Sequence, residues 1–154
     1  FGINKTIGDL AGPMAFAILM GSSRAFYGKF GDKINLERFM QYSAVLCMVS
    51  YLMIAFIPVP ALGILGCAVC GLSVGIMWPG TFSMAAASVK RGGTALFALL
   101  ALAGDVGCSS GPTYVGMISG ALNDNLKLGI FAALIFPVLM IMGIKMIGSL
   151  QKYN

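Results

Sequence analysis

Residues 27–38 read YGKFGDKINLER, and this short polar stretch decides how the rest of the chain is interpreted. It holds five charged side chains, in a sequence that has only ten basic and five acidic residues in total. The chain is strongly apolar on both sides of it, and charged groups are costly in the hydrocarbon of a membrane. The stretch therefore predicts a point where the chain leaves a membrane between two apolar segments.

The composition indicates an integral membrane protein built from helices. Hydrophobic residues make up 58% of the chain and charged residues 10%, whereas soluble domains carry roughly a quarter charged residues. Residues 39–89 contain no charged side chain, which leaves room for two spans of roughly 20 residues. The net charge of +5 does not predict nucleic-acid binding, because the basic residues cluster at the ends of apolar segments.

The apolar pattern predicts an all-α membrane protein with five transmembrane helices and with its two ends on opposite sides of the bilayer. We expect spans at residues 6–26, 39–57, 61–88, 94–122 and 128–147. Arg24 lies near the end of the first span, where its side chain can reach toward the headgroups. One side of the membrane collects eight basic residues and is therefore expected to be cytoplasmic, namely Arg24, Lys29, Lys33, Arg38, Lys90, Arg91, Lys145 and Lys152.

The third span is interrupted by glycines and by Pro79, which predict close helix packing and a kink at Pro79 and Gly80. Proline has no N–H, so Pro79 leaves the carbonyl of Gly75 without its helical partner. Trp78 lies beside this kink, where its ring either stacks on a flat ligand or fills the space that the kink opens. Thr81 can add a hydrogen bond to a ligand, although hydroxyls on helices often bond their own backbone.

Asp105 is the sharpest single candidate, because it lies near the middle of the fourth span. An ionised carboxylate there costs about 2.5 to 3.5 kcal/mol on insertion scales. We expect a proton- or cation-coupling site that faces a central cavity, with Ser109 and Tyr114 as neighbours; the alternative is a protonated carboxyl that bonds Ser109 or another helix. Asp9 is a second candidate, close to the end of the first span.

The glycines of the fourth span, in contrast, are expected to form packing faces between helices. They are Gly107, Gly111, Gly116 and Gly120. Enzymatic, metal-dependent or cofactor chemistry is not expected, because the chain has no His and its Cys67–Cys70 pair lacks further ligands.

The segment GKFGDKINLER resembles the loop signature of the major facilitator superfamily, which reads roughly G-x-L-x-D-R-x-G-R-K. Asn35 and Leu36 depart from this pattern, and Arg38 supplies its last base late. The segments WPGTFSMAAA and GDVGCSSGP are also similar to bacterial sugar and solute symporters of the fucose-transporter type. The matching positions of the signature are Gly28, Phe30, Asp32 and Lys33.

This resemblance implies the second half of a twelve-helix transporter, with the five spans as helices eight to twelve of a six-helix bundle. It implies secondary active transport of a small solute by alternating access, coupled to a proton or cation, in a bacterial plasma membrane. The partners would be the bilayer, the solute, the coupling ion and the missing first half. The alternative is a non-transporting membrane protein, such as a channel subunit or an assembly factor.

The resemblance also implies that the polar stretch is a conformational latch. In the family the signature glycine lets helices approach, and its charged residues pair across the bundle in one conformation. The alternative is a solvated, positively charged loop without a latch function. The latch residues would be Gly28, Asp32, Lys33 and Arg38.

Overall fold

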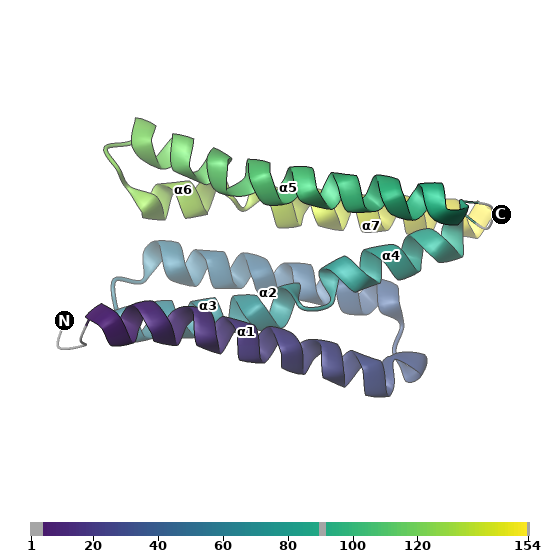
Figure 1. Ribbon diagram of the computed structural model, residues 1–154, viewed down its shortest axis with the longest axis horizontal. Helices are drawn as coiled ribbons and strands as arrows, with labels where there is room; N and C mark the ends of the chain where they lie inside the picture. Colours follow the sequence, from purple (N-terminus) through teal and green to yellow (C-terminus); the bar gives the residue numbers. More distant parts are fainter. Residues whose placement is uncertain (1–4, 90–91, 154) are drawn as a thin grey trace.

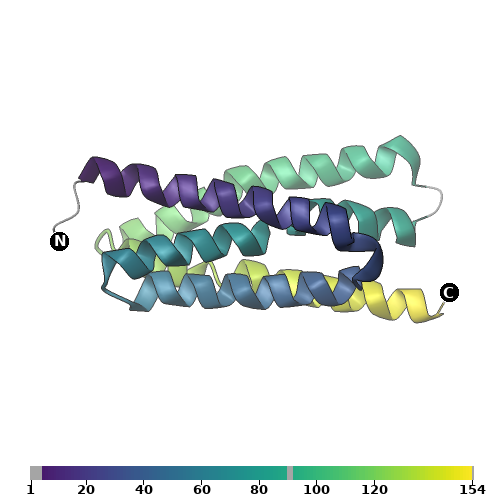
Figure 2. The same ribbon diagram turned by 90° about the horizontal axis from the view of Figure 1, so that it is seen from below.

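The computed structural model describes residues 5–89 and 92–153, and over these ranges the chain is a bundle of helices without strands (Figure 1). The two ends of the chain lie at opposite ends of the bundle in both views (Figures 1 and 2). In chain order the elements are α1 (Lys5–Phe30), the 3-10 turn η1 (Gly31–Lys33), α2 (Leu36–Phe56), α3 (Pro60–Val74), α4 (Met77–Ser88), α5 (Gly93–Ala121), α6 (Leu126–Ala132) and α7 (Ile135–Tyr153).

Four helical segments are long and apolar enough to cross a membrane: Leu36–Phe56, Ala61–Ser88, Gly93–Ala121 and Leu126–Ser149. They coincide with the last four expected spans, which fits a membrane protein. The first expected span corresponds to α1, which is 26 residues long but is not among these four. Its second half carries Ser22, Ser23 and Arg24, which lower its mean hydropathy, so a fifth span is not confirmed.

The polar stretch 27–38 is largely helical. Helix α1 continues through Phe30, four residues beyond the expected end of the span, and η1 follows directly. Asn35 then caps α2, because its side-chain oxygen accepts a hydrogen bond of 3.1 Å from the backbone N–H of Arg38. The rings of Tyr27 and Phe39 stack across the turn with their centroids 5.7 Å apart. The stretch is thus a tight, structured connection between two helices.

Two of the four apolar segments are interrupted near a proline. The helix breaks at residues 75–76, between α3 and α4, and again at residues 133–134, between α6 and α7. Each break begins four residues before a proline, Pro79 or Pro137, whose missing N–H would have bonded that carbonyl. The kink expected at Pro79 and Gly80 is therefore one turn earlier, and both of these residues lie inside α4.

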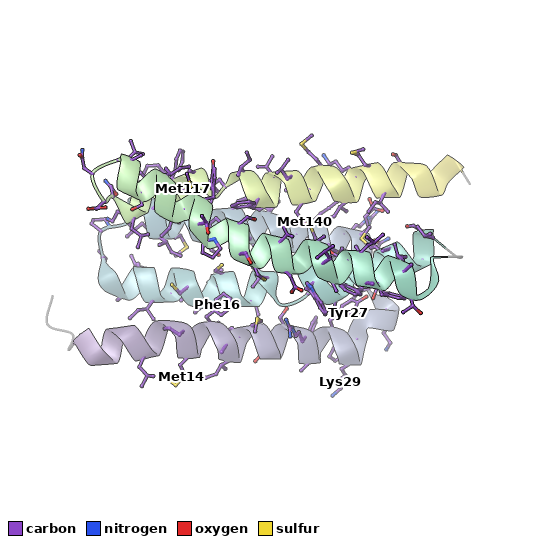
Figure 3. All side chains as sticks on the ribbon, turned by 45° about the horizontal axis from the view of Figure 1, so that its top comes forward. Met14, Phe16, Tyr27, Lys29, Met117 and Met140 are labelled. Carbon is purple, nitrogen blue, oxygen red and sulfur yellow. The ribbon has the colours of Figure 1, made fainter. Side chains whose placement is uncertain are left out.

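Helices α1 and α3 approach each other through a glycine pair. A β-carbon at Gly71 would overlap the backbone carbonyl of Phe16, and one at Gly75 would lie 2.8 Å from the carbonyl oxygen of Met20. Phe16 lies on the side of α1 that faces α3, whereas Met14 points away (Figure 3). The spacing Gly71-x-x-x-Gly75 is the one that lets membrane helices come into backbone contact. Close packing of the third span is therefore confirmed at these positions.

A second packing centre joins α2, α4 and α7. Met40, Met84 and Ile144 are each at most 6% exposed and contact one another. Gly80 belongs to the same region, because a β-carbon there would lie 2.7 Å from the sulfur of Met40. These side chains hold the second half of the broken third segment against the rest of the bundle.

Helix α5 is the least covered of the long helices. Ser119 is its one buried residue among those described. The expectation that Gly107, Gly111, Gly116 and Gly120 form packing faces is wrong for the described chain, because no atom lies within 4 Å of a β-carbon built on any of these four. The physical reason is that α5 contacts its neighbours on one side only and leaves these positions open.

Candidate functional site

The candidate site is a groove along α5 with a volume of about 590 Å³. Its lining residues recur at intervals of one and four positions, which keeps them on one face of the helix. Met117, labelled in Figure 3, marks the far end of the groove and is 71% exposed. The groove is lined by Asp105, Val106, Ser109, Ser110, Thr113, Tyr114 and Met117. The structure thus brings together three of the expected site residues, Asp105, Ser109 and Tyr114.

Asp105 is positioned well inside α5. It follows Gly93, the first residue of the helix, by twelve positions, which corresponds to about 18 Å along the axis. A hydrocarbon core is about 30 Å thick, so the carboxyl lies far from either end of a helix that spans it. Its side chain is exposed on the groove face. In a membrane such a group must face protein or water, because lipid cannot solvate it.

Two of the four hydroxyl groups that line the groove, those of Ser109 and Thr113, are bonded to their own helix. Ser109 Oγ donates to the backbone carbonyl of Asp105 at 3.0 Å, and Thr113 Oγ1 donates to that of Ser109 at 2.8 Å. Ser109 therefore donates to the main chain of Asp105, and not to its carboxyl as in the alternative interpretation of a protonated Asp105. Both hydroxyl hydrogens are occupied, so each oxygen offers only its lone pairs to the groove.

The opposite face of α5 makes the helix contacts. A β-carbon at Gly129 in α6 would lie 2.7 Å from the carbonyl oxygen of Val115 and 3.3 Å from Cβ of Ser119. A β-carbon at Gly104 would lie 3.2 Å from Nε1 of Trp78. At about 100° per residue, Gly104, Val115 and Ser119 lie on the side of the helix away from the groove. Trp78 thus contacts α5 on a different side from the groove that carries Asp105.

The side chains of α4 that were candidates for ligand binding are engaged with other groups. The Trp78 ring lies 4.3 Å from that of Phe82, which in turn stacks at 5.8 Å on Phe97 of α5. Thr81 Oγ1 donates to the backbone carbonyl of Met77 at 2.7 Å. This arrangement matches the space-filling alternative for Trp78, although 56% of the residue remains exposed. Asp9 lies in α1, and its side chain is outside those that the structure describes.

Arg24 has a role that the sequence pattern did not indicate. Its Nε donates a hydrogen bond of 3.0 Å to the carbonyl oxygen of Gly75, the carbonyl that Pro79 leaves without a helical partner. A cation at the C-terminal end of a helix also opposes the negative end of its dipole. The side chain does not extend toward the headgroups but caps the end of α3. The Gly71–Gly75 contact places α1 close enough for this bond.

Removal of the Arg24 guanidinium is expected to destabilise the protein at the junction between α3 and α4. We expect Arg24→Ala to lower the free energy of unfolding by about 1 to 3 kcal/mol, because a charged donor to a partly buried carbonyl is lost. Thermal unfolding of the purified protein in one detergent measures this loss. The matched control is Arg38→Ala, which removes an exposed guanidinium from the start of α2. Equal losses for the two variants would contradict the capping role.

The expected latch residues make few contacts among the described side chains. Gly28 has no atom within 4 Å of a β-carbon built on it, so it permits no close helix approach here. Lys33 and Arg38 are exposed, and the side chain of Asp32 is outside those described. Two other residues of the stretch contact distant helices. A β-carbon at Gly148 of α7 would lie 2.6 Å from Oε1 of Glu37, and Leu36 packs against the cluster of Met40, Met84 and Ile144.

No family model matches the chain, and neither a curated protein nor a solved structure matches it. The likeness of the polar stretch to the major facilitator signature therefore stands on the residues of this sequence alone.

Proposed function

We propose that this chain is the second half of a secondary active transporter, which moves a small solute across a membrane by alternating access. The observation that carries the proposal is the Asp105 groove. A carboxylate lies in the interior of a membrane-length helix, on an exposed face that meets α7 at its edge through the Tyr114–Phe136 ring contact of 5.7 Å. Ionisable groups at such positions occur in proteins where they face a bundle interior or a water-filled cavity.

The interrupted helices are a second support. Transporters commonly build their sites from discontinuous helices, and the breaks fall where glycine and proline interrupt apolar segments. This chain has two such breaks, at residues 75–76 and 133–134. The first is close to a charged side chain, Arg24. A purely structural bundle has no need to disrupt backbone hydrogen bonds within the membrane.

The resemblance of the polar stretch completes the proposal. Under it, α1 is the first of five spans and completes that number. The five spans are helices eight to twelve of a major facilitator fold, and the open face of α5 meets the first half of the transporter. The stretch and the C-terminus lie at the same end of the bundle (Figure 1). The excess of basic residues at that end makes it cytoplasmic, in the plasma membrane of a bacterium.

Uptake into vesicles tests the proposal. The full-length protein is reconstituted into liposomes and screened with a panel of labelled solutes, with and without an imposed proton or sodium gradient. We expect saturable uptake of at least one solute, together with counterflow, in which unlabelled solute inside the vesicles accelerates entry of the label. Non-saturable conductance would indicate a channel subunit, and the absence of both would favour an assembly factor.

A further inference from the structure

We propose that the Asp105 groove binds an organic ammonium ion, whose N–H groups donate to Asp105 and to the hydroxyl oxygens of α5. The inference names the class of ligand for the groove, and it rests on the proposed function in so far as this face of α5 borders a solute pathway. Three properties of the groove carry it: its hydrogen-bonding character, its charge and its size.

The groove presents acceptors. Asp105 contributes carboxylate oxygens, which accept only, when it is ionised. The hydroxyl hydrogens of Ser109 and Thr113 are directed to backbone carbonyls, so their oxygens are left to accept. A ligand that matches this surface carries several N–H donors.

The charge of the groove has one sign. Among the described residues that line it, Asp105 is the one charged side chain, and no Lys or Arg lies beside it. A carboxylate removed from water is stable only with a partner or a proton. An ammonium head group supplies the opposite charge and the donors at once. An anionic ligand would add a second negative charge to the same site.

The extent and the apolar residues of the groove favour an organic cation over a bare metal ion. The groove is an open surface of about 590 Å³ whose lining residues all belong to α5, so it can contact one side of a small organic molecule. An alkali-metal ion needs several oxygens that converge at short distance, whereas these acceptors are spread along one helix. Val106, Met117 and the ring of Tyr114 line the rest, and an aromatic face also attracts cations.

Calorimetric titration of the purified full-length protein in detergent tests the proposal. The probes are methylammonium, butylammonium, phenethylammonium and spermidine, with neutral 2-phenylethanol and anionic 3-phenylpropanoate as shape controls for phenethylammonium. We expect at least one ammonium probe to bind, and its neutral or anionic counterpart to bind at least about tenfold more weakly. Asp105→Asn is expected to lower the affinity for the ammonium probe by about tenfold or more, because a charged hydrogen-bond partner is lost.

Two further variants keep the result interpretable. Asp105→Glu retains the carboxylate and is expected to bind the probe within about tenfold of the original protein. Asp124→Asn removes a carboxylate from the turn after α5, at a positive φ of 57° that Asn adopts readily. This variant is expected to bind the ammonium probe as tightly as the original protein. Failure of every ammonium probe, equal binding of the uncharged control, or binding that survives Asp105→Asn would each overturn the proposal.

The outcome is separable from that of the proposed function. Saturable uptake of neutral or anionic solutes, without charge-selective binding at Asp105, would overturn the ammonium site and leave the transporter in place. Charge-selective binding by a protein that shows neither uptake nor counterflow would support the site and overturn transport.

Discussion

Asp105→Asn is expected to reduce the initial rate of solute uptake by the reconstituted protein about 10- to 100-fold or more. The substitution keeps the shape of the side chain but removes the charge that holds the solute or the coupling ion, and a hydrogen bond to a charged group is worth about 1.5 to 3 kcal/mol. Radiolabel flux into liposomes under a gradient measures the loss. Solute exchange at equilibrium is expected to fall as well, because in the proposed ammonium site the same carboxylate would contact the solute.

Asp124→Asn is the matched control for this experiment, since the same chemical change is made in an exposed turn. Its uptake is expected to equal that of the unmodified protein. Undiminished uptake by the Asp105 variant would remove the groove from the transport mechanism. Exchange that survives while accumulation is lost would show that Asp105 carries the coupling ion alone, and it would contradict the ammonium site.

Gly71→Ala is expected to separate α1 from α3 and to lower the free energy of unfolding by about 1 to 3 kcal/mol or more. The added methyl group would overlap the backbone carbonyl of Phe16, and backbone cannot move aside as a flexible side chain can. The midpoint of thermal unfolding, followed by size-exclusion chromatography of the heated protein in detergent, measures the effect. The Arg24–Gly75 hydrogen bond is expected to be lost in the same variant, because it depends on the approach of α1.

Gly63→Ala is the control, because Gly63 lies in the same helix and no atom lies within 4 Å of a β-carbon built there. Alanine favours helices over glycine by up to about 1 kcal/mol, so this variant is expected to be as stable as the original protein or more stable. A Gly71→Ala protein that matches Gly63→Ala would show that α1 and α3 are not in backbone contact.

Much of the helical arrangement could be predicted from the sequence, because charge and proline mark its boundaries. The uncharged run from Phe39 to Val89 and the basic turn after it set the ends of three segments to within a few residues. The sequence pattern locates the two helix breaks less accurately than it locates the helix ends. The pattern locates the proline, whereas the structure opens at the carbonyl that the proline fails to bond, one turn earlier.

The candidate site was predictable where it depends on one helix. Asp105 and Ser109 share a face because they lie four positions apart, and both line the groove. Tyr114, nine positions from Asp105, lies about 180° around the helix axis and borders the other edge of the groove. Contacts between helices were not predictable in the same way. The sequence pattern does not place the Arg24 side chain, whose partner lies 51 residues away, although the freed carbonyl and the Gly71–Gly75 spacing were both visible. The open glycines of α5 were taken for packing positions for the same reason.

The interruption at residues 75–76 divides the third segment into two parts with different attachments. Helix α3 is fixed to α1 by the glycine contact and by Arg24, whereas α4 is fixed to α7 through Met84 and Ile144. Pro79 has no N–H to bond the carbonyl of Gly75, so a tilt of α4 at this junction would break fewer backbone hydrogen bonds than a bend elsewhere in the segment. Such a tilt would swing Trp78 and Phe82 against α5 while the pairing of α1 with α3 stays intact. The aromatic contacts of α4 would then transmit that tilt to the helix that carries Asp105.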